Sequence, residues 1–219
     1  MAHGKRPGPI GINSTDVIDS GTLARSRSST PGPIGSKITS TQYANTNLTS
    51  REKIREYAIG QMELVKKKEK CSCHAMADIW GYAVQFYTGF WNNDEETYVE
   101  DVSYVLAGVN EWATSTDQTQ VGQRVFDDSG FKEEFKDGSN QVQHFSAGVQ
   151  SGYQWGELAR YGHRIMRPDS DQDEALNDVS TTTGLRLDGI GLSLSEVKNR
   201  IENKVCTPKC GICNGGRGR

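Results

Sequence analysis

The sequence predicts a mostly α-helical protein, with a single globular helical domain preceded by a flexible segment rich in Pro, Gly and Ser. Beyond Leu48, apolar residues recur at the three- and four-residue spacing of amphipathic helices. Residues 49–52 (TSRE) and 193–196 (SLSE) have the pattern of capping boxes, which begin helices. The polar stretches 114–120 and 127–138 give no support for a sheet.

Length and composition favour one core with an appended tail. At 219 residues the chain is longer than an average domain and too short for two large ones. Apolar residues make up 34% of it, and 24 glycines suggest backbone that does not pack. We assign residues 1–48 to the flexible segment, 49–206 to the helical domain and 207–219 to a tail rich in Cys and Gly.

Charge and hydropathy give no support for a nucleic-acid-binding or membrane-spanning protein. The formal net charge of −3 gives no broad positive field for nucleic acid. No stretch approaches the roughly 20 apolar residues of a membrane-spanning helix, and the N-terminal residues lack the apolar stretch of a signal peptide. We therefore predict no nucleic-acid partner, no transmembrane segment, and any export by a route without a cleaved signal peptide.

Four stretches of the domain have helical periodicity or caps. The first predicted helix begins at residues 49–52 and continues to about Val65, and others are expected over 73–90 and 96–112. The capping box at 193–196 begins a short helix that reaches about Val205. Aromatic residues at helical spacing usually belong to the core, so we expect packing roles for Trp80, Tyr87 and Trp112.

The first 48 residues contain an exact repeat of the pentapeptide PGPIG. Its two copies are Pro7, Gly8, Pro9, Ile10, Gly11 and Pro31, Gly32, Pro33, Ile34, Gly35. Proline fixes its own φ and biases the preceding residue toward extended geometry, so each copy is a stiff, kinked peptide that could dock in a groove. The alternative is a low-complexity linker that repeats by chance.

The segment RPGPIGINSTDVIDSGTLARSRSSTPGPIG resembles the N-terminal segments of effectors of the type VI secretion system, a contractile injection apparatus of Gram-negative bacteria. The resemblance covers about the first 36 residues. It implies delivery through a component of the secretion apparatus and implies no catalytic activity. It also implies a cognate immunity protein as a partner.

Glycines recur every four residues in the stretch after Asn140. If residues 142–166 form one helix, then His144, Gly148, Gly152 and Gly156 follow one slowly rotating face. Each glycine costs about 1 kcal/mol relative to alanine inside a helix, so three in register need a compensating reason. They either let a second helix approach closely or leave space for a substrate beside His144.

Candidate acid–base residues lie in the same region. An imidazole beside an open groove suits general acid or base work, so His144 is the first candidate. Glu157 lies further along the predicted helix, and Asp173 belongs to an acidic cluster after Pro168. These carboxylates could orient the imidazole or bind a metal, or the cluster could be a solvated, helix-capping turn. The sequence requires no cofactor, and any metal stays unknown.

Five cysteines form two groups, near residues 71–74 (CSCH) and 206–213 (CTPKCGIC). They are Cys71, Cys73, Cys206, Cys210 and Cys213. The favoured interpretation is a disulfide staple that joins the first helices to the last, which leaves one thiol if two bonds form. Zinc ligation is an alternative. A third is catalytic: Cys73 at a helix N-terminus as nucleophile, with His144 as base.

Residues 140–189 also resemble poorly characterised C-terminal domains of bacterial toxin-like proteins. Together with the N-terminal resemblance, this implies an antibacterial effector, delivered to the periplasm of a target cell, that attacks the cell envelope. Peptidoglycan hydrolysis is the expected activity, with His144, Glu157 and Asp173 as acid, base or orienting groups. The alternative is a non-catalytic binding or cargo module of a contractile secretion system.

Overall fold

The computed structural model describes residues 48–89, 94–109, 126–138, 140–159, 170–189 and 191–210. The chain divides into two units, residues 1–38 and 39–219, and all described residues belong to the second. Both PGPIG copies therefore lie outside the described residues. Within the described ranges the structure is helical and contains no β-strand, so the predicted fold class is confirmed.

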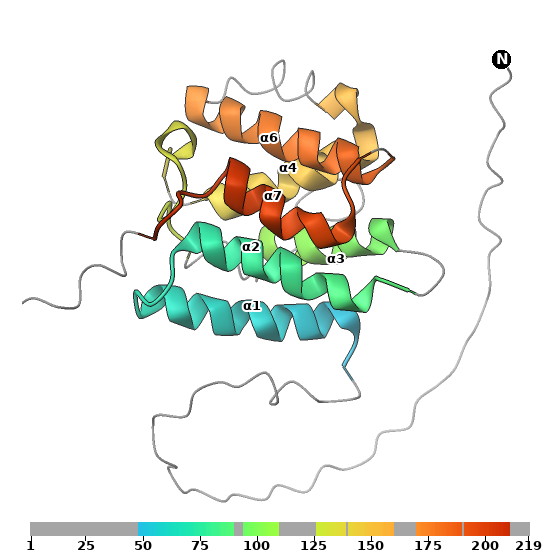
Figure 1. The fold of residues 1–219 in the computed structure, drawn as a ribbon, viewed down its shortest axis with the longest axis horizontal. Coiled ribbons are helices and arrows are strands. Elements are labelled where there is room, and N and C mark those ends of the chain that lie inside the picture. Colours follow the sequence, from blue (N-terminus) through green and yellow to red (C-terminus); the bar gives the residue numbers. More distant parts are fainter. Residues whose placement is uncertain are drawn as a thin grey trace, which may run out of the picture. The chain divides into compact units, whose positions relative to one another are not determined.

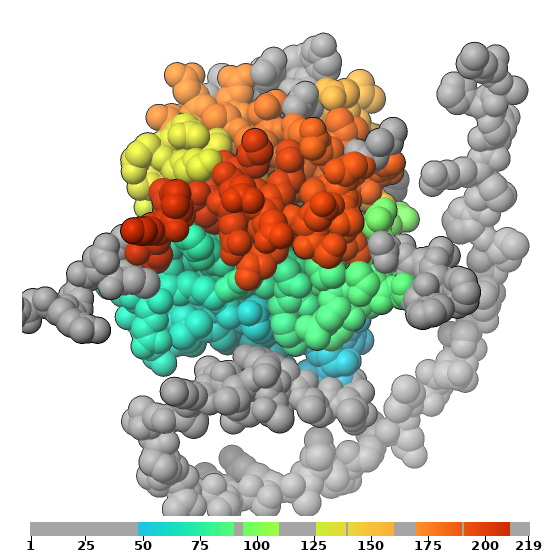
Figure 2. All heavy atoms as spheres, viewed as in Figure 1, coloured from blue at the N-terminus to red at the C-terminus, as the bar shows by residue number. Residues whose placement is uncertain are grey.

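The helices pack side by side around one hydrophobic core. In chain order they are α1 (Ser50–Lys66), α2 (Ser72–Ala83), α3 (Glu95–Ala107), α4 (Gln141–Trp155), α6 (Asp171–Leu187) and α7 (Val197–Lys204), with the 3-10 turns η2 (Val84–Phe86), η4 (Glu133–Phe135) and η5 (Leu194–Glu196). Helix α2 contacts both α1 and α7, and α4 contacts both α3 and α6 (Figure 1). In Figure 2 the side chains of α7 cover the centre of one face, between those of α6 and α2.

Both predicted capping boxes are present. At the start of α1, Glu52 donates its amide to Thr49 Oγ1 at 3.3 Å, and the Thr49 amide donates to the Glu52 carboxylate at 2.8 Å. Before α7, the Ser193 amide donates to Glu196 Oε2 at 2.9 Å. Each box satisfies amides that the first turn of a helix leaves without partners, and so fixes where the helix begins.

The predicted ends of the second and third helices are too late. Helix α2 ends at Ala83 and continues only as the 3-10 turn η2. Helix α3 ends at Ala107 because Gly108 adopts a left-handed conformation with φ of 63°. No described helix is long and apolar enough to cross a lipid bilayer.

The core is centred on α2 and α3. Trp80 and Tyr98 are fully buried, and the Tyr98 hydroxyl donates to the Trp80 carbonyl at 2.9 Å. Tyr87 is 6% exposed and packs edge-on against Tyr98, with ring centroids 5.8 Å apart. Trp80 and Tyr87 therefore pack in the core, as the sequence predicts, whereas Trp112 lies outside the described residues.

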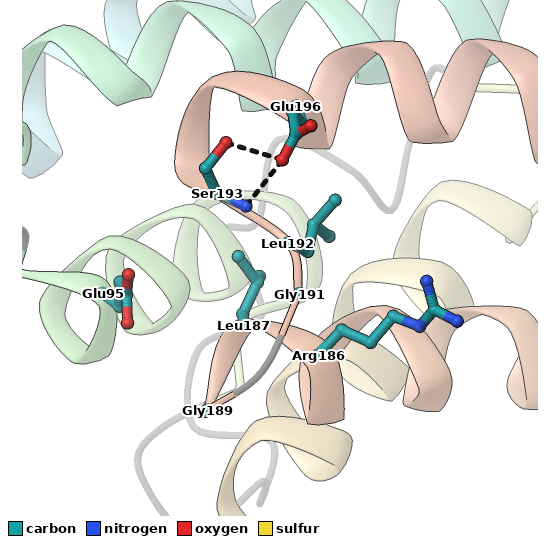
Figure 3. Close-up of a pocket in the computed structure, with 8 residues that line it drawn as sticks. All are labelled: Glu95, Arg186, Leu187, Gly189, Gly191, Leu192, Ser193 and Glu196. Carbon is teal, nitrogen blue, oxygen red and sulfur yellow. Dashed lines mark hydrogen bonds between the residues drawn. The ribbon is translucent and has the colours of Figure 1, made fainter.

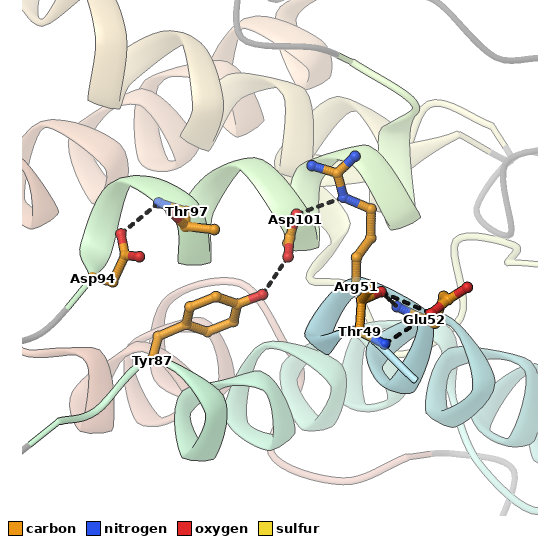
Figure 4. A network of polar contacts seen from close by, with 7 residues as sticks. All are labelled: Thr49, Arg51, Glu52, Tyr87, Asp94, Thr97 and Asp101. Atoms are coloured by element: carbon orange, nitrogen blue, oxygen red, sulfur yellow. Dashed lines mark hydrogen bonds and ion pairs between the residues drawn. The ribbon is translucent and has the colours of Figure 1, made fainter. Parts of the chain in front are cut away.

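A buried carboxylate, Asp101 on α3, links three elements (Figure 4). It accepts hydrogen bonds from Arg51 Nε of α1, at 2.5 Å, and from the hydroxyl of Tyr87, which follows η2. Arg51 also lies over the ring of Tyr104, 4.6 Å from its centroid. Burial, together with the hydrogen bond to Asp101 and its charge, raises the pKa of Tyr87 and keeps its hydroxyl a donor.

Asp78 on α2 joins two lysines from other parts of the chain. It pairs with Lys70, which follows α1, and with Lys198 Nζ on α7 at 2.6 Å. Gly81 gives the stem of Lys198 room, because a β-carbon there would lie 2.9 Å from Lys198 Cδ. Burial raises the pKa of Asp78, but hydrogen bonds from both lysines outweigh it, and the net pKa is lowered.

We expect Asp78→Asn to destabilise the domain at neutral pH by about 1.5–3 kcal/mol, the range for hydrogen bonds to charged groups. Because the folded-state pKa lies below the ordinary value of 3.8, the carboxylate contributes stability above that value. This contribution disappears as the pH falls through the folded-state pKa. Urea unfolding at pH 7 and pH 2.5 measures both effects, and an equal loss at the two pH values would contradict the ion-pair explanation.

Candidate functional site

The glycines of α4 bring it into close contact with α6. A β-carbon on Gly148 would overlap the hydroxyl of Ser180, and one on Gly152 would overlap the backbone of Thr181. On the facing helix, a β-carbon on Gly184 would overlap the carbonyl oxygen of Val149. These glycines therefore serve close helix packing and leave no groove for a substrate.

Gly156 has a different role from the glycines before it. It adopts a φ of 55° and ends α4, so the single helix predicted over residues 142–166 is wrong. Glu157 follows that break, and the axis from His144 to Trp155 alone is about 16 Å long at 1.5 Å per residue. The structure does not bring Glu157 to His144.

His144 and Asp173 meet across the α4–α6 interface. Their Nδ1 and Oδ1 atoms lie 3.0 Å apart, with side-chain exposures of 29% and 14%. Asp173 stands in the first turn of α6, where its amide donates to the side chain of the N-cap residue Ser170 at 3.2 Å. The acidic cluster is thus the start of a helix, and one member of it faces the imidazole.

The partners of His144 indicate its tautomer. Because a carboxylate only accepts, Nδ1 carries the proton that is donated to Asp173. Nε2 lies 2.8 Å from the Asn140 side-chain nitrogen, so in the neutral ring it accepts from that amide. A carboxylate-oriented imidazole can take up a proton at Nε2 once Asn140 gives way to a substrate or water.

The cysteines are paired between the two groups. Cys71 bonds to Cys210 and Cys73 to Cys206, with Cα–Cα distances of 5.7 and 5.5 Å. These bonds tie the start of α2 to the segment after α7, which is the staple expected from the sequence.

The pairing rules out the two other interpretations of these four cysteines, namely zinc ligation and a catalytic role for Cys73. Cys73 is fully buried and its sulfur is bonded, so it has no thiol to ionise and cannot serve as the nucleophile. A bonded sulfur is likewise no zinc ligand, and no group of His, Cys, Asp or Glu among the described residues is placed to hold a metal ion. Cys213 lies outside the described residues.

A polar surface hollow of about 350 Å³ lies at the opposite end of α6 from Asp173. It is lined by Glu95, Arg186, Leu187, Gly189, Gly191, Leu192, Ser193 and Glu196. Glu95 and Arg186 extend from opposite sides of it, and Glu196 is held by its capping bonds to Ser193 (Figure 3). About 21 Å of helix separates Asp173 from Leu187, so the His144–Asp173 pair is no part of this hollow.

No sequence pattern indicates this hollow, because a loop that joins α6 to η5 forms much of its wall. Comparison of the chain with protein-family models, with curated proteins and with solved structures finds no match.

Proposed function

We propose that this chain is a secreted effector whose helical domain works in an oxidising compartment, namely the periplasm of a target bacterium. The observation that supports this best is the pair of disulfides between α2 and the segment after α7. Structural disulfides persist outside the cytoplasm, where no reducing pool opens them. A domain that depends on two of them is suited to work in the envelope.

The activity we propose is hydrolysis of peptidoglycan, with His144 as the acid–base group and Asp173 as the residue that orients it. Nε2 of His144 would accept a proton from water as the water oxygen attacks the scissile carbon, and would then return this proton to the leaving group as the scissile bond breaks. Asp173, 3.0 Å from Nδ1, would stabilise the resulting imidazolium. The pair is partly exposed, so a polymeric substrate could reach it from solvent.

The experiment expresses the full chain in a Gram-negative host, either in the cytoplasm or directed to the periplasm, and follows growth. Killing confined to the periplasm is expected, and purified protein should release soluble fragments from peptidoglycan. His144→Ala should reduce that release by about 10²–10⁴-fold, the usual contribution of acid–base catalysis. Gln154→Ala, an exposed change on the same helix, is the matched control.

Two results would count against the hydrolase. Full release of fragments by a His144→Ala protein with an unchanged melting temperature would remove His144 from the mechanism. Absence of killing in both compartments would show that the protein is not a toxin to this host, and would contradict the effector proposal as a whole.

Delivery is the role we propose for residues 1–48, through docking of the PGPIG repeats on a component of the secretion apparatus. Deletion of residues 1–40 should abolish secretion and leave the melting temperature of the domain unchanged. Unfolding of the shortened chain would show instead that this segment belongs to the domain.

A non-catalytic binding module is the second candidate, and one observation favours it. Trp155 and Leu158 are 48% and 71% exposed, which is unusual for large apolar side chains three residues apart. If binding is the activity, Trp155→Ser with Leu158→Ser should abolish toxicity in cells, whereas His144→Ala should have no effect. The opposite pattern favours the hydrolase.

A further inference from the structure

Two arginines from different helices lie close together, Arg186 on α6 and Arg200 on α7. Arg200 donates from Nε to Thr183 Oγ1 of α6 at 2.9 Å. Thr183 and Arg186 are three residues apart on α6, a spacing that places Cβ atoms about 5–6 Å from each other on one side of a helix. The guanidinium of Arg200 is therefore anchored next to Arg186. Burial, together with the charge of Arg186, lowers the pKa of Arg200.

Neither arginine has an acidic partner in the part of the chain that the structure describes. The ion pairs found there include neither Arg186 nor Arg200. Glu196 precedes Arg200 by four residues, but its carboxylate accepts hydrogen bonds from the amide and the hydroxyl of Ser193, at 2.9 and 2.7 Å. Two guanidiniums without a counter-charge repel each other, and an anion bound between them would remove this repulsion.

The charge of the arginine pair suits a phosphomonoester better than a carboxylate. A guanidinium binds either group through two parallel N–H···O hydrogen bonds. A carboxylate carries one negative charge and would leave one arginine uncompensated. A phosphomonoester carries about −1.5 to −2 at pH 7 and has three acceptor oxygens, so one group can neutralise both side chains. Arg200 uses only Nε for Thr183, which leaves its two terminal nitrogens for such an anion.

Arg186 also lines the surface hollow of about 350 Å³, so a phosphate on the arginines would have its carrier beside that hollow. The volume is at the low end of the roughly 300–1,000 Å³ of ligand pockets and suits one sugar ring. Among the described residues that line it, only Leu187 and Leu192 have apolar side chains, which suits the face of a ring and not an acyl chain. Glu95 stands across the hollow from Arg186 (Figure 3) and forms no ion pair with a described residue, so its carboxylate can accept hydrogen bonds from ring hydroxyls.

We propose that Arg186 and Arg200 bind the phosphate of a soluble sugar phosphate, whose ring occupies the adjoining hollow. The phosphate accepts hydrogen bonds from both guanidiniums, and ring hydroxyls donate to Glu95. The site lies at the opposite end of α6 from Asp173, so it is separate from the His144–Asp173 pair and does not depend on hydrolase activity.

Isothermal titration calorimetry of the full-length chain with glucose 6-phosphate tests the site, at pH 7.5 and at low salt so that exposed charges are not screened. Glucose 6-phosphate should bind about tenfold more tightly than inorganic phosphate, because only the ester has hydroxyls that reach Glu95. Glucose without phosphate should bind more weakly than either. Equal affinities for glucose 6-phosphate and inorganic phosphate would contradict a role for the hollow.

Arg186→Gln and Arg200→Gln should each weaken binding of glucose 6-phosphate by about 10- to 100-fold, through loss of hydrogen bonds to a charged group. Arg55→Gln is the matched control, because it makes the same change of charge at an exposed position of α1. Arg200→Gln also loses the bond to Thr183 and so can affect folding, whereas Arg186 is exposed and tests the site without that complication. An Arg186→Gln protein that binds glucose 6-phosphate as tightly as wild type would show that the proposal is wrong.

Glu95→Gln separates the two halves of the site. It should weaken binding of glucose 6-phosphate by about fivefold, since a neutral amide accepts more weakly than a carboxylate, and should leave the affinity for inorganic phosphate unchanged. An equal loss for both ligands would show that Glu95 does not contact the ring, and would contradict the proposed placement of the sugar.

Discussion

Gly184→Ala is expected to destabilise the helical domain by about 3 kcal/mol or more, at the upper end of what overpacking costs. The added β-carbon would overlap the Val149 carbonyl oxygen and lie 2.6 Å from the amide nitrogen of Tyr153. These are backbone atoms in the middle of α4, so no side-chain rotation can relieve the overlap. The two helices would have to separate, and the most extensive helix contact of the domain would loosen.

Thermal and urea unfolding of the purified protein measure this loss. Gly189→Ala is the matched control, because no atom lies within 4 Å of a β-carbon built at Gly189, just after α6 ends. The free energy of unfolding of that variant should lie within about 0.5 kcal/mol of the wild-type value, as it does for most surface substitutions. Similar melting temperatures for the two variants would show that the stability of the domain does not depend on the close contact between α4 and α6 at Gly184.

Loss of the two disulfides should be strongly non-additive. Each bond closes nearly the same loop, across separations of 139 and 133 residues, so either one alone retains most of the constraint on the unfolded chain. With one bond present, the other closes only the short segments between the cysteines, which is worth about 2 kcal/mol in the chain-entropy model. Removal of the last bond should then cost about 5 kcal/mol.

Urea unfolding of four proteins tests this coupling, and all four carry Cys213→Ser so that only the four paired cysteines are varied. The first has both bonds, two have one cysteine pair replaced by alanine, and the fourth has neither pair. The loss in the fourth protein should exceed the sum of the two single losses by about 3 kcal/mol. Additive losses would mean that the bonds act through local contacts in the folded state.

Local signals in the sequence predicted where helices begin. The capping boxes at Thr49 and Ser193 need only residues three positions apart, so tertiary structure does not alter them. Helix α6 was not predicted, because its run of three threonines before Gly184 disfavours a helix in isolation. It forms because its small residues pack against α4, and no local pattern reports that contact.

Local sequence patterns also do not report the tertiary contacts that form the candidate site. The sequence identified His144 and Asp173 by residue type, but their meeting depends on how α4 and α6 align. The predicted helix also favours Glu157 as a candidate, but Gly156 ends α4 and is not one more interface glycine. Cysteine spacing suggested a staple and could not say which sulfurs pair, since several connectivities are compatible with it.

The position of the staple also determines when it can form. Synthesis runs from the N-terminus, and Cys206 and Cys210 are made 133 and 139 residues after their partners. Neither crosslink can close until the ribosome has made every described helix. In the delivery that we propose, a chain finished in a reducing cytoplasm would keep its thiols and would unfold more easily than the oxidised chain, as passage through a narrow conduit requires. Oxidation in the periplasm of the target cell would then stabilise the folded state.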